Sequence, residues 1–275
     1  MIISASRRTD IPAFLGKSFF KALAYYNNIL VRNPFNRRQI KEVELTPDTV
    51  DAIVFWSKYP KGIIKHLDDI SALGYDYMFL YTLTGYGPIL EEQVPRVEKT
   101  IEVFKKLSDK IGSDKVIWRY DPIVYSNITD DKYHIENFSK LAKELSSYTN
   151  KVIISFLDFY EKLLPRFKGL ENDHQITISD IMQMPEKAIT LASRIREIAE
   201  SHNLEIQSCA EEELLANSGI KPGGCIDCEY LSKIFNKRIH YPKDKNQRKT
   251  CKCCQSVDIG EYGNCCFRCM YCYAI

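Results

Sequence analysis

A chain of 275 residues, 45% of them hydrophobic and 27% charged, can bury a sizeable core as one α/β barrel or as two smaller domains. Its net charge of +2 provides no overall field that would collect nucleic acid or an anionic membrane surface. Arg7, Arg8 and Asp10 interrupt the apolar N-terminal run before a signal peptide could form, and no later run reaches the length of a membrane-spanning helix. We therefore expect a cytoplasmic protein with no membrane partner.

Short β-rich runs alternate with longer amphipathic segments along the chain, which is typical of βα units. In chain order, strands are expected over residues 2–6, 52–56, 77–83, 116–120, 152–156 and 204–208. Repeated apolar residues predict helices over 94–111, 135–145 and 181–202, and Gly219 is expected to end a later short helix. Residues 29–45 look like a hairpin-like insertion with Asn33 and Pro34 at its turn.

These βα units predict an α/β fold with a TIM-like barrel, either partial or closed by further units that the pattern does not reveal. In both cases the chemistry is expected at the C-terminal ends of the strands. From the residues that follow the strands, we predict catalytic or substrate-binding roles for Arg7, Arg8, Asp10, Arg119, Asp121 and Glu211. Arginine forks can grip a carboxylate or phosphate, and carboxyl groups can move protons. In the alternative interpretation, arginines and aspartates pair at the barrel rim and only stabilise it.

Seven of the ten cysteines lie within residues 251–272, in a chain too large for a small disulfide framework, which favours metal binding. Cys265, Cys269 and Cys272 form a C-x3-C-x2-C pattern. This spacing lets one short loop place three thiolates on three corners of a 4Fe-4S cluster. The fourth iron would then be open to a small molecule. Zinc remains the alternative for these thiols.

The same pattern, with Tyr271 before its last cysteine, resembles the cluster motif of radical S-adenosylmethionine enzymes. The run from Tyr271 to Ala274 is similar to the form found near the spore photoproduct lyase branch. The resemblance implies an open-site 4Fe-4S cluster, S-adenosylmethionine as a cofactor, and an electron donor such as flavodoxin or ferredoxin. In those enzymes the motif follows the first strand and a Gly-Gly-Glu-like segment contacts the methionine group, and this sequence has neither feature.

A second cysteine set lies upstream. By spacing alone, Cys225 and Cys228 with Cys251 and Cys254 form a zinc pattern. The whole chain also resembles a bacterial family described as domain of unknown function 1848, through SASRRTDIPAF, RNPF, VIWRYDPI, SCAEE and KNQRKTCKCCQSVDIGEYGNCCFRCMYCYA. That resemblance implies a second 4Fe-4S cluster or a zinc ion, with Cys228, Cys254 and Cys266 as additions. Its ligands would be Cys209, Cys225, Cys251 and Cys253.

We therefore expect a βα barrel over residues 1–220 and a cysteine-rich metal-binding tail over residues 221–275, packed on the barrel mouth. A basic run in the tail would offset the charge of a thiolate cluster or touch phosphates, and nucleic-acid contact is the less favoured of its uses. Its members are Lys237, Arg238, Lys243, Lys245, Arg248, Lys249 and Lys252.

Three functions follow from this sequence. The first is a radical S-adenosylmethionine-like enzyme acting on an unknown small molecule. The second is a barrel hydrolase or lyase, including one that repairs nucleic acid, with structural zinc. The third is a non-catalytic redox or sensor protein that carries iron-sulfur clusters. We prefer the first, because a three-cysteine motif at a barrel mouth fits open-site chemistry better than pure electron transfer.

Overall fold

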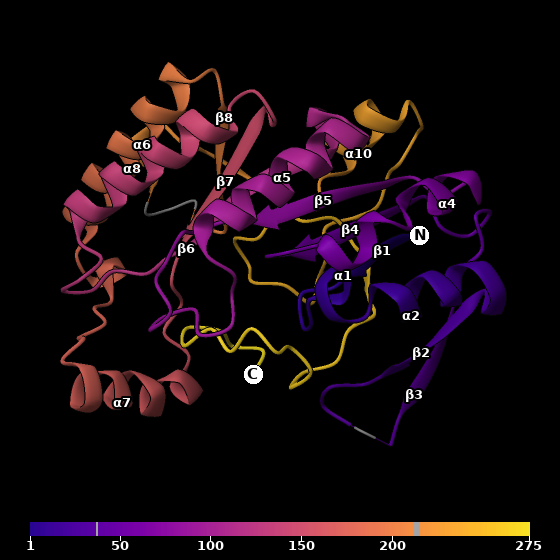
Figure 1. The fold of residues 1–275 in the computed structure, drawn as a ribbon, viewed down its shortest axis with the longest axis horizontal. Coiled ribbons are helices and arrows are strands. Elements are labelled where there is room, and N and C mark those ends of the chain that lie inside the picture. The colour runs from indigo at the N-terminus through magenta and orange to yellow at the C-terminus, as the bar shows by residue number, and fades with distance from the viewer. Residues whose placement is uncertain (37, 212–214) are drawn as a thin grey trace.

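The computed structural model describes residues 1–36, 38–211 and 215–275, and its centre is a parallel β-sheet (Figure 1). The strands of this sheet are β1 (Ile2–Ala5), β4 (Ala52–Ser57), β5 (Tyr77–Thr82), β6 (Val116–Ile123), β7 (Lys151–Phe156), β8 (Glu205–Cys209), β9 (Lys221–Gly223) and β10 (Val257–Asp258). Their order is β10-β1-β4-β5-β6-β7-β8-β9, and each neighbouring pair is parallel. In the described part of the chain β10 and β9 form the two edges, so the sheet is barrel-like but not closed.

Helices follow most strands. Their bounds are α1 (Ile11–Phe14), α2 (Gly16–Lys21), α3 (Lys61–Ile64), α4 (Leu67–Ala72), α5 (Val97–Ile111), α6 (Asp131–Leu145), α7 (Leu164–His174), α8 (Pro185–Ser201) and α10 (Cys228–Phe235). Local sequence sets several ends. The Asp130 carboxylate accepts a hydrogen bond from the Tyr133 amide at 2.9 Å and caps α6, and Pro185 occupies the first turn of α8, where no amide hydrogen is needed.

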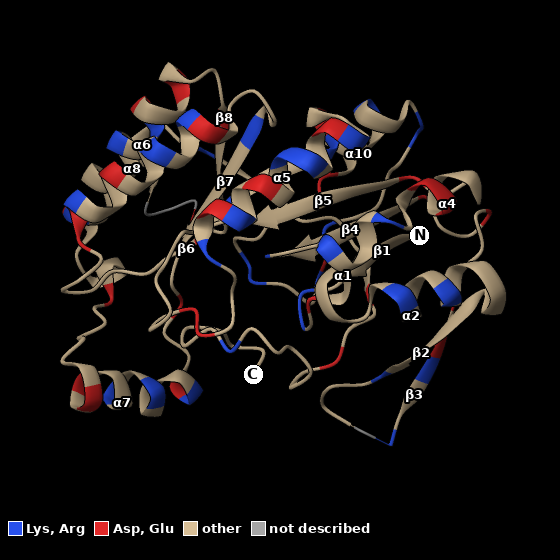
Figure 2. Ribbon diagram, in the orientation of Figure 1, with Lys and Arg blue, Asp and Glu red and all other residues tan. Residues whose placement is uncertain are grey.

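The two faces of the sheet are buried in different ways. Strands β4, β5 and β7 are almost wholly buried, as expected when both faces of a parallel sheet are covered. One face packs on α5, α6 and α8, whose outer surfaces carry charges of both signs, whereas β4 and β5 carry none (Figure 2). The other face packs on the C-terminal tail, where Ile226, Leu231 and Ile239 belong to the same core as strand residues such as Leu80 and Ile117.

The sequence predicted this architecture in part. The α/β class and the mostly parallel sheet are confirmed, and the six expected strands agree with β1 and β4–β8 to within a few residues. The closed form of the barrel is wrong, because the further strands are not hidden βα units: β9 and β10 are short segments within residues 221–275 that pair along their own backbones with β8 and β1. The expected division at residue 220 stays a prediction.

The hairpin insertion is also present. Strands β2 (Asn28–Arg32) and β3 (Ile40–Glu44) form an antiparallel pair that projects from the body of the protein (Figure 1). Gly219 has a φ of +77°, in the left-handed region, and it follows a short turn at Ala216–Ser218. The start of the short helix expected before it lies outside the described residues. Within those residues, no helix is long and apolar enough to cross a bilayer.

We expect the buried side chain of His134 to make stability depend on pH. Its Nε2 lies 3.0 Å from the Val124 carbonyl, which can only accept, so Nδ1 accepts from the Tyr120 hydroxyl at 2.8 Å. Burial lowers the pKa of His134 from 6.5 to about 4. The unfolded chain therefore binds the extra proton more readily, and stability present above pH 6.5 is lost as the pH falls towards 4, by roughly 3 kcal/mol.

Urea titrations at pH values between 4 and 8 measure this effect, with His134→Gln as the comparison. The variant is less stable at neutral pH, because it loses the bond to Tyr120, but its free energy of unfolding should fall less steeply through the acid range. Parallel curves for the two proteins would contradict the assignment.

Candidate functional site

A cavity of about 1000 Å³ lies where strand ends and tail meet. Five of the six predicted catalytic residues line it, and Glu211 is the exception. The strand-end residues in its wall include Arg7, Arg8, Asp10, Trp56, Lys58, Arg119, Asp121, Asp158 and Cys209, and the tail residues include Cys225, Arg248, Cys251, Cys253, Cys265, Cys269 and Cys272. All seven predicted metal ligands therefore face one space.

The upstream cysteines that the family resemblance implied gather in one buried place. This four-thiol group consists of Cys209, Cys225, Cys251 and Cys253, with Cys209 at the end of β8 and Cys225 two residues after β9. The Sγ atoms of Cys225 and Cys209 are 3.3 Å apart. Hydrogen bonds from the Cys225 and Cys251 thiols lower the pKa of Cys253. The pKa of Cys225 is raised by its own hydrogen bonds with Cys209 and Cys253. The group thus shares protons that a bound metal would displace.

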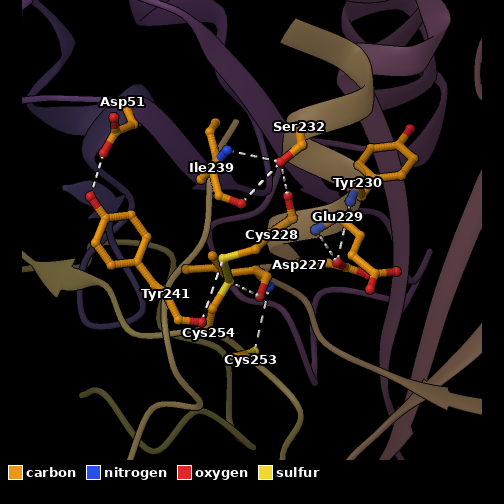
Figure 3. Close-up of a disulfide and its surroundings, with 11 residues drawn as sticks. Asp51, Asp227, Cys228, Glu229, Tyr230, Ser232, Ile239, Tyr241, Cys253 and Cys254 are labelled. Carbon is orange, nitrogen blue, oxygen red and sulfur yellow. Dashed lines mark hydrogen bonds between the residues drawn. A yellow bond between two sulfur atoms is a disulfide. The ribbon is translucent and has the colours of Figure 1, made fainter. Parts of the chain in front are cut away.

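Two members of the spacing-based zinc pattern are instead bonded to each other. Cys228 and Cys254 form a disulfide, with their Cα atoms 6.3 Å apart and Cys253 alongside (Figure 3). Backbone contacts bring them together: Asp227 caps the helix that Cys228 begins, and the Cys254 amide donates to the Ile226 carbonyl at 2.9 Å. This pair departs from the expectation that the cysteines serve a metal, and the set that the resemblance implied stays a prediction.

The C-terminal cysteines lie on a loop that is fixed to the segment after β5. The Met270 amide donates to the Leu90 carbonyl at 2.9 Å, and Cys269 forms a β-bridge with Glu91. Burial raises the pKa of both Cys265 and Cys269, and the neighbouring thiol of Cys272 raises both further. Cys266 is exposed, which agrees with its being an addition to the motif. All three thiols of the motif line the cavity.

A charged network that the sequence did not reveal borders this motif. Lys58 Nζ lies 2.6 Å from Glu91 Oε1, which also accepts from the Thr84 hydroxyl at 2.7 Å and from the Tyr271 hydroxyl. Burial lowers the pKa of Lys58, but the nearby Glu91 carboxylate raises it, and the net shift is upward. Lys58 is therefore a fixed cation beside the motif. The strand-end rule did not identify Glu91 as a candidate site residue, because Glu91 lies in a loop.

Asp10 has a visible structural role at the same wall. Its Oδ1 accepts from the Ala13 amide at 3.0 Å, which caps α1, and its Oδ2 accepts from the Lys58 amide at 2.7 Å. Burial raises the pKa of Asp10 to about 6, although these hydrogen bonds act against it. The carboxyl group thus ties the loop after β1 to the loop after β4, and a catalytic role for it stays a prediction.

The predicted arginines pair with carboxylates only in part. Arg119 forms a salt bridge with Asp121, and Arg248 contacts both oxygens of Asp158 at 2.5 and 2.6 Å, as the rim-pairing alternative expected. Arg8 Nε lies 3.8 Å from Asp258. Within the described ranges, however, Nη2 of Arg7 and Nε of Arg119 are buried without a hydrogen-bond partner. Pairing therefore does not satisfy the positive charge of the cavity.

Glu211 lies behind the cavity wall near these pairs. Burial raises its pKa to about 7, the Arg248 guanidinium lowers it, and Asp158 raises it. At neutral pH the carboxyl group is thus poised between its two protonation states.

A second part of the basic run is also paired, since Lys237 forms a 2.5 Å salt bridge with Asp76.

The thiols suit a metal-thiolate centre by chemistry, although their present positions are not those of ligands. Across residues 1–36, 38–211 and 215–275, no three His, Cys, Asp or Glu side chains converge to hold a metal ion. Each cysteine set nevertheless supplies only soft sulfur donors, and the partnerless guanidinium atoms of Arg7 and Arg119 line the same cavity as the thiols. Iron-sulfur clusters and zinc both fit such donors.

One carboxylate makes several of the bonds that fix the tail to the end of β1. Asp258, in β10, accepts from the hydroxyls of Ser4 and Ser6 at 3.0 and 2.7 Å and from the Arg7 amide at 2.8 Å. It also accepts from the Gly260 amide at 3.1 Å. These bonds join β10 to the end of β1, and they add to the contacts with Leu90 and Glu91 that position the cysteine loop.

The fold and the cavity define an α/β protein with an open, barrel-like parallel sheet and a cavity lined by thiols. The chain belongs to the family described as Domain of unknown function (DUF1848), which matches residues 2–274. Among solved structures, a D-hydantoinase from a Bacillus sp. AR9 is similar at 11% sequence identity with a TM-score of 0.33, over 62% of this chain and 36% of the hydantoinase. No curated protein matches.

We expect Asp258→Ala to destabilise the fold by about 3 kcal/mol, because several donors lose a charged acceptor in a largely buried place. Asp258→Asn, which keeps one carbonyl oxygen, should lose less. Urea unfolding measures the loss, and Asp109→Ala on the exposed surface of α5 is the control. A change within 0.5 kcal/mol, the usual range for surface substitutions, would mean that Asp258 does not hold the tail.

Proposed function

We propose that this protein is an iron-sulfur enzyme of the radical S-adenosylmethionine type, acting on a small molecule in the thiol-lined cavity. The observation that carries the proposal is the placement of Cys265, Cys269 and Cys272 together in the cavity wall. Because Cys266 is exposed, the loop offers three buried or half-buried thiols and not four. A cluster with three protein ligands leaves one iron for a ligand from the cavity.

Cys265, Cys269 and Cys272 would hold such a cluster, which would supply one-electron reduction of S-adenosylmethionine, and so radical chemistry on the substrate, with electrons from a flavodoxin or ferredoxin. The chain's own residues would balance the charge of the cluster and hold its loop in place. Lys58, held by Glu91, places a positive charge beside Cys269 and Cys272 and would offset the negative charge of their thiolates. Tyr271 fixes the loop by its bond to the same carboxylate.

Other residues of the cavity wall would handle the substrate. Arg7, Arg8 and Arg119 favour an anionic group, since guanidinium forks bind carboxylate and phosphate. Asp10 and Asp121 would contact polar groups. Glu211 has a pKa near neutrality and is therefore suited to give or take a proton near the cavity. In this proposal the four-thiol group holds a second metal centre, either a 4Fe-4S cluster or zinc.

The test is metal analysis of protein purified without oxygen. We expect iron and sulfide in the wild type and a loss of about four irons per chain in Cys269→Ser, because a 4Fe-4S cluster cannot remain on two thiolates. Cys266→Ser is the matched control, since the exposed thiol next to the motif should not affect the iron content.

The dithionite-reduced protein then separates the three functions by electron paramagnetic resonance. A spectrum that shifts when S-adenosylmethionine is added, with 5'-deoxyadenosine formed, supports the enzyme. Zinc without iron would overturn it in favour of a hydrolase or lyase with structural zinc. Clusters that are reduced reversibly but do not respond to the added molecule would favour a redox or sensor protein.

A further inference from the structure

Two arginines of the cavity wall, Arg7 and Arg119, also border the four-thiol group. Arg7 follows β1, Arg119 lies within β6, and both guanidinium groups stack on the ring of Trp56, at 5.2 and 4.6 Å from its centroid. The Trp56 ring is held by its bond to the Ser4 hydroxyl at 3.0 Å. It belongs to the same buried cluster as all four thiols. Two positive charges are therefore fixed on one rigid support beside the sulfur atoms.

The nearby carboxylates leave part of this charge unmatched. Asp258 bonds the backbone amide of Arg7, while the Arg7 side chain reaches only the neutral Ser256 hydroxyl, at 3.4 Å. Asp121 binds Nη2 of Arg119, and Thr82 accepts from Nη1 at 3.5 Å. Among the described residues, Nη2 of Arg7 and Nε of Arg119 are left without a partner. Buried guanidinium nitrogens without partners are costly, so a structure that keeps two of them implies a missing anion.

The thiols themselves are the anion that fits best. Both arginine side chains line the same cavity as the four thiols, and the Trp56 ring on which they stack packs in one buried cluster with those thiols. Four thiolates around a zinc ion leave a net charge of about −2, and four around an oxidised 4Fe-4S core leave the same. Two arginines on one side of the group match that charge.

We propose that Arg7 and Arg119, aligned by Trp56, are the counter-charges that retain the metal centre of the four-thiol group. They are positioning residues for that centre. Arg8 differs from them, because it lies over the Tyr262 ring and near Asp258. The inference rests on the second metal centre of the proposed function, but it does not depend on the C-terminal cluster or on S-adenosylmethionine.

The experiment uses the full chain with Cys265, Cys269 and Cys272 replaced by serine, so that bound metal reports the four-thiol group alone. Iron and zinc are measured after anaerobic purification, and their loss is followed in excess chelator. We expect the rate constant of metal loss to rise about 10- to 100-fold in Arg7→Met with Arg119→Met, the usual effect of removing groups that support ligands. The double lysine variant keeps the charge and should stay close to the parent. Arg8→Met is the control and should also match the parent.

A second measurement separates charge from packing. Without metal, the two buried guanidinium groups lack a full counter-charge, so the metal-free double methionine variant should melt no lower than the metal-free parent. The metal-loaded variant should melt lower than its parent. The proposal is overturned if the methionine variant keeps its metal, if the lysine variant loses metal as fast, if the variant melts lower in both forms alike, or if the parent binds no metal. A failure of the C-terminal cluster alone would leave these results unchanged.

Discussion

The structure depends on how the inner face of an open parallel sheet is covered. Strands β4, β5 and β7 are apolar on both faces, so the face away from α5, α6 and α8 must also be removed from water. Tail residues such as Ile226, Leu231 and Ile239 do this, and the buried cysteines pack with them. The segment that completes the core therefore also carries the thiols. Core packing and the candidate metal chemistry share the same residues.

The way in which the charged side chains of the cavity are paired follows from this arrangement. A cavity lined by sulfur and by low-polarity strands makes each buried cation or anion expensive, and each one present has a fixed neighbour. Lys58 is matched by Glu91, and Arg248 by Asp158. Arg7 and Arg119 are matched less completely, and they face the thiols. The counter-charge role proposed for Arg7 and Arg119 rests on this difference between matched and unmatched groups.

The sequence predicted those strands and helices that a local pattern of residues encodes. Strands such as β4 and β7 were found because they are continuous apolar runs, and α5 because its apolar residues repeat with helical period. The segments Lys221–Gly223 and Val257–Asp258 have no such signal, since a lysine, a proline, a glycine and an aspartate are poor strand formers. They are strands because β8 and β1 present free edges to them.

The same limit applied to the site. The cysteines could be grouped by spacing, but spacing alone chose Cys228 and Cys254, which the fold pairs with each other. The strand-end rule found Arg7, Arg119 and Asp121, because the ends of parallel strands meet. It missed Glu91, which reaches the site from a loop. Side chains positioned by distant backbone contacts cannot be read from local sequence.

The pairing of β10 with β1 joins residues at opposite ends of the described chain, with Ser4 bonded to Asp258 across a sequence separation of 254. During synthesis β1 therefore keeps one edge unpaired until residues 257–258 have left the ribosome. An open strand edge invites association with other chains. The thiols of residues 251–272 therefore come together only after the segment that pairs with β1 has been synthesised.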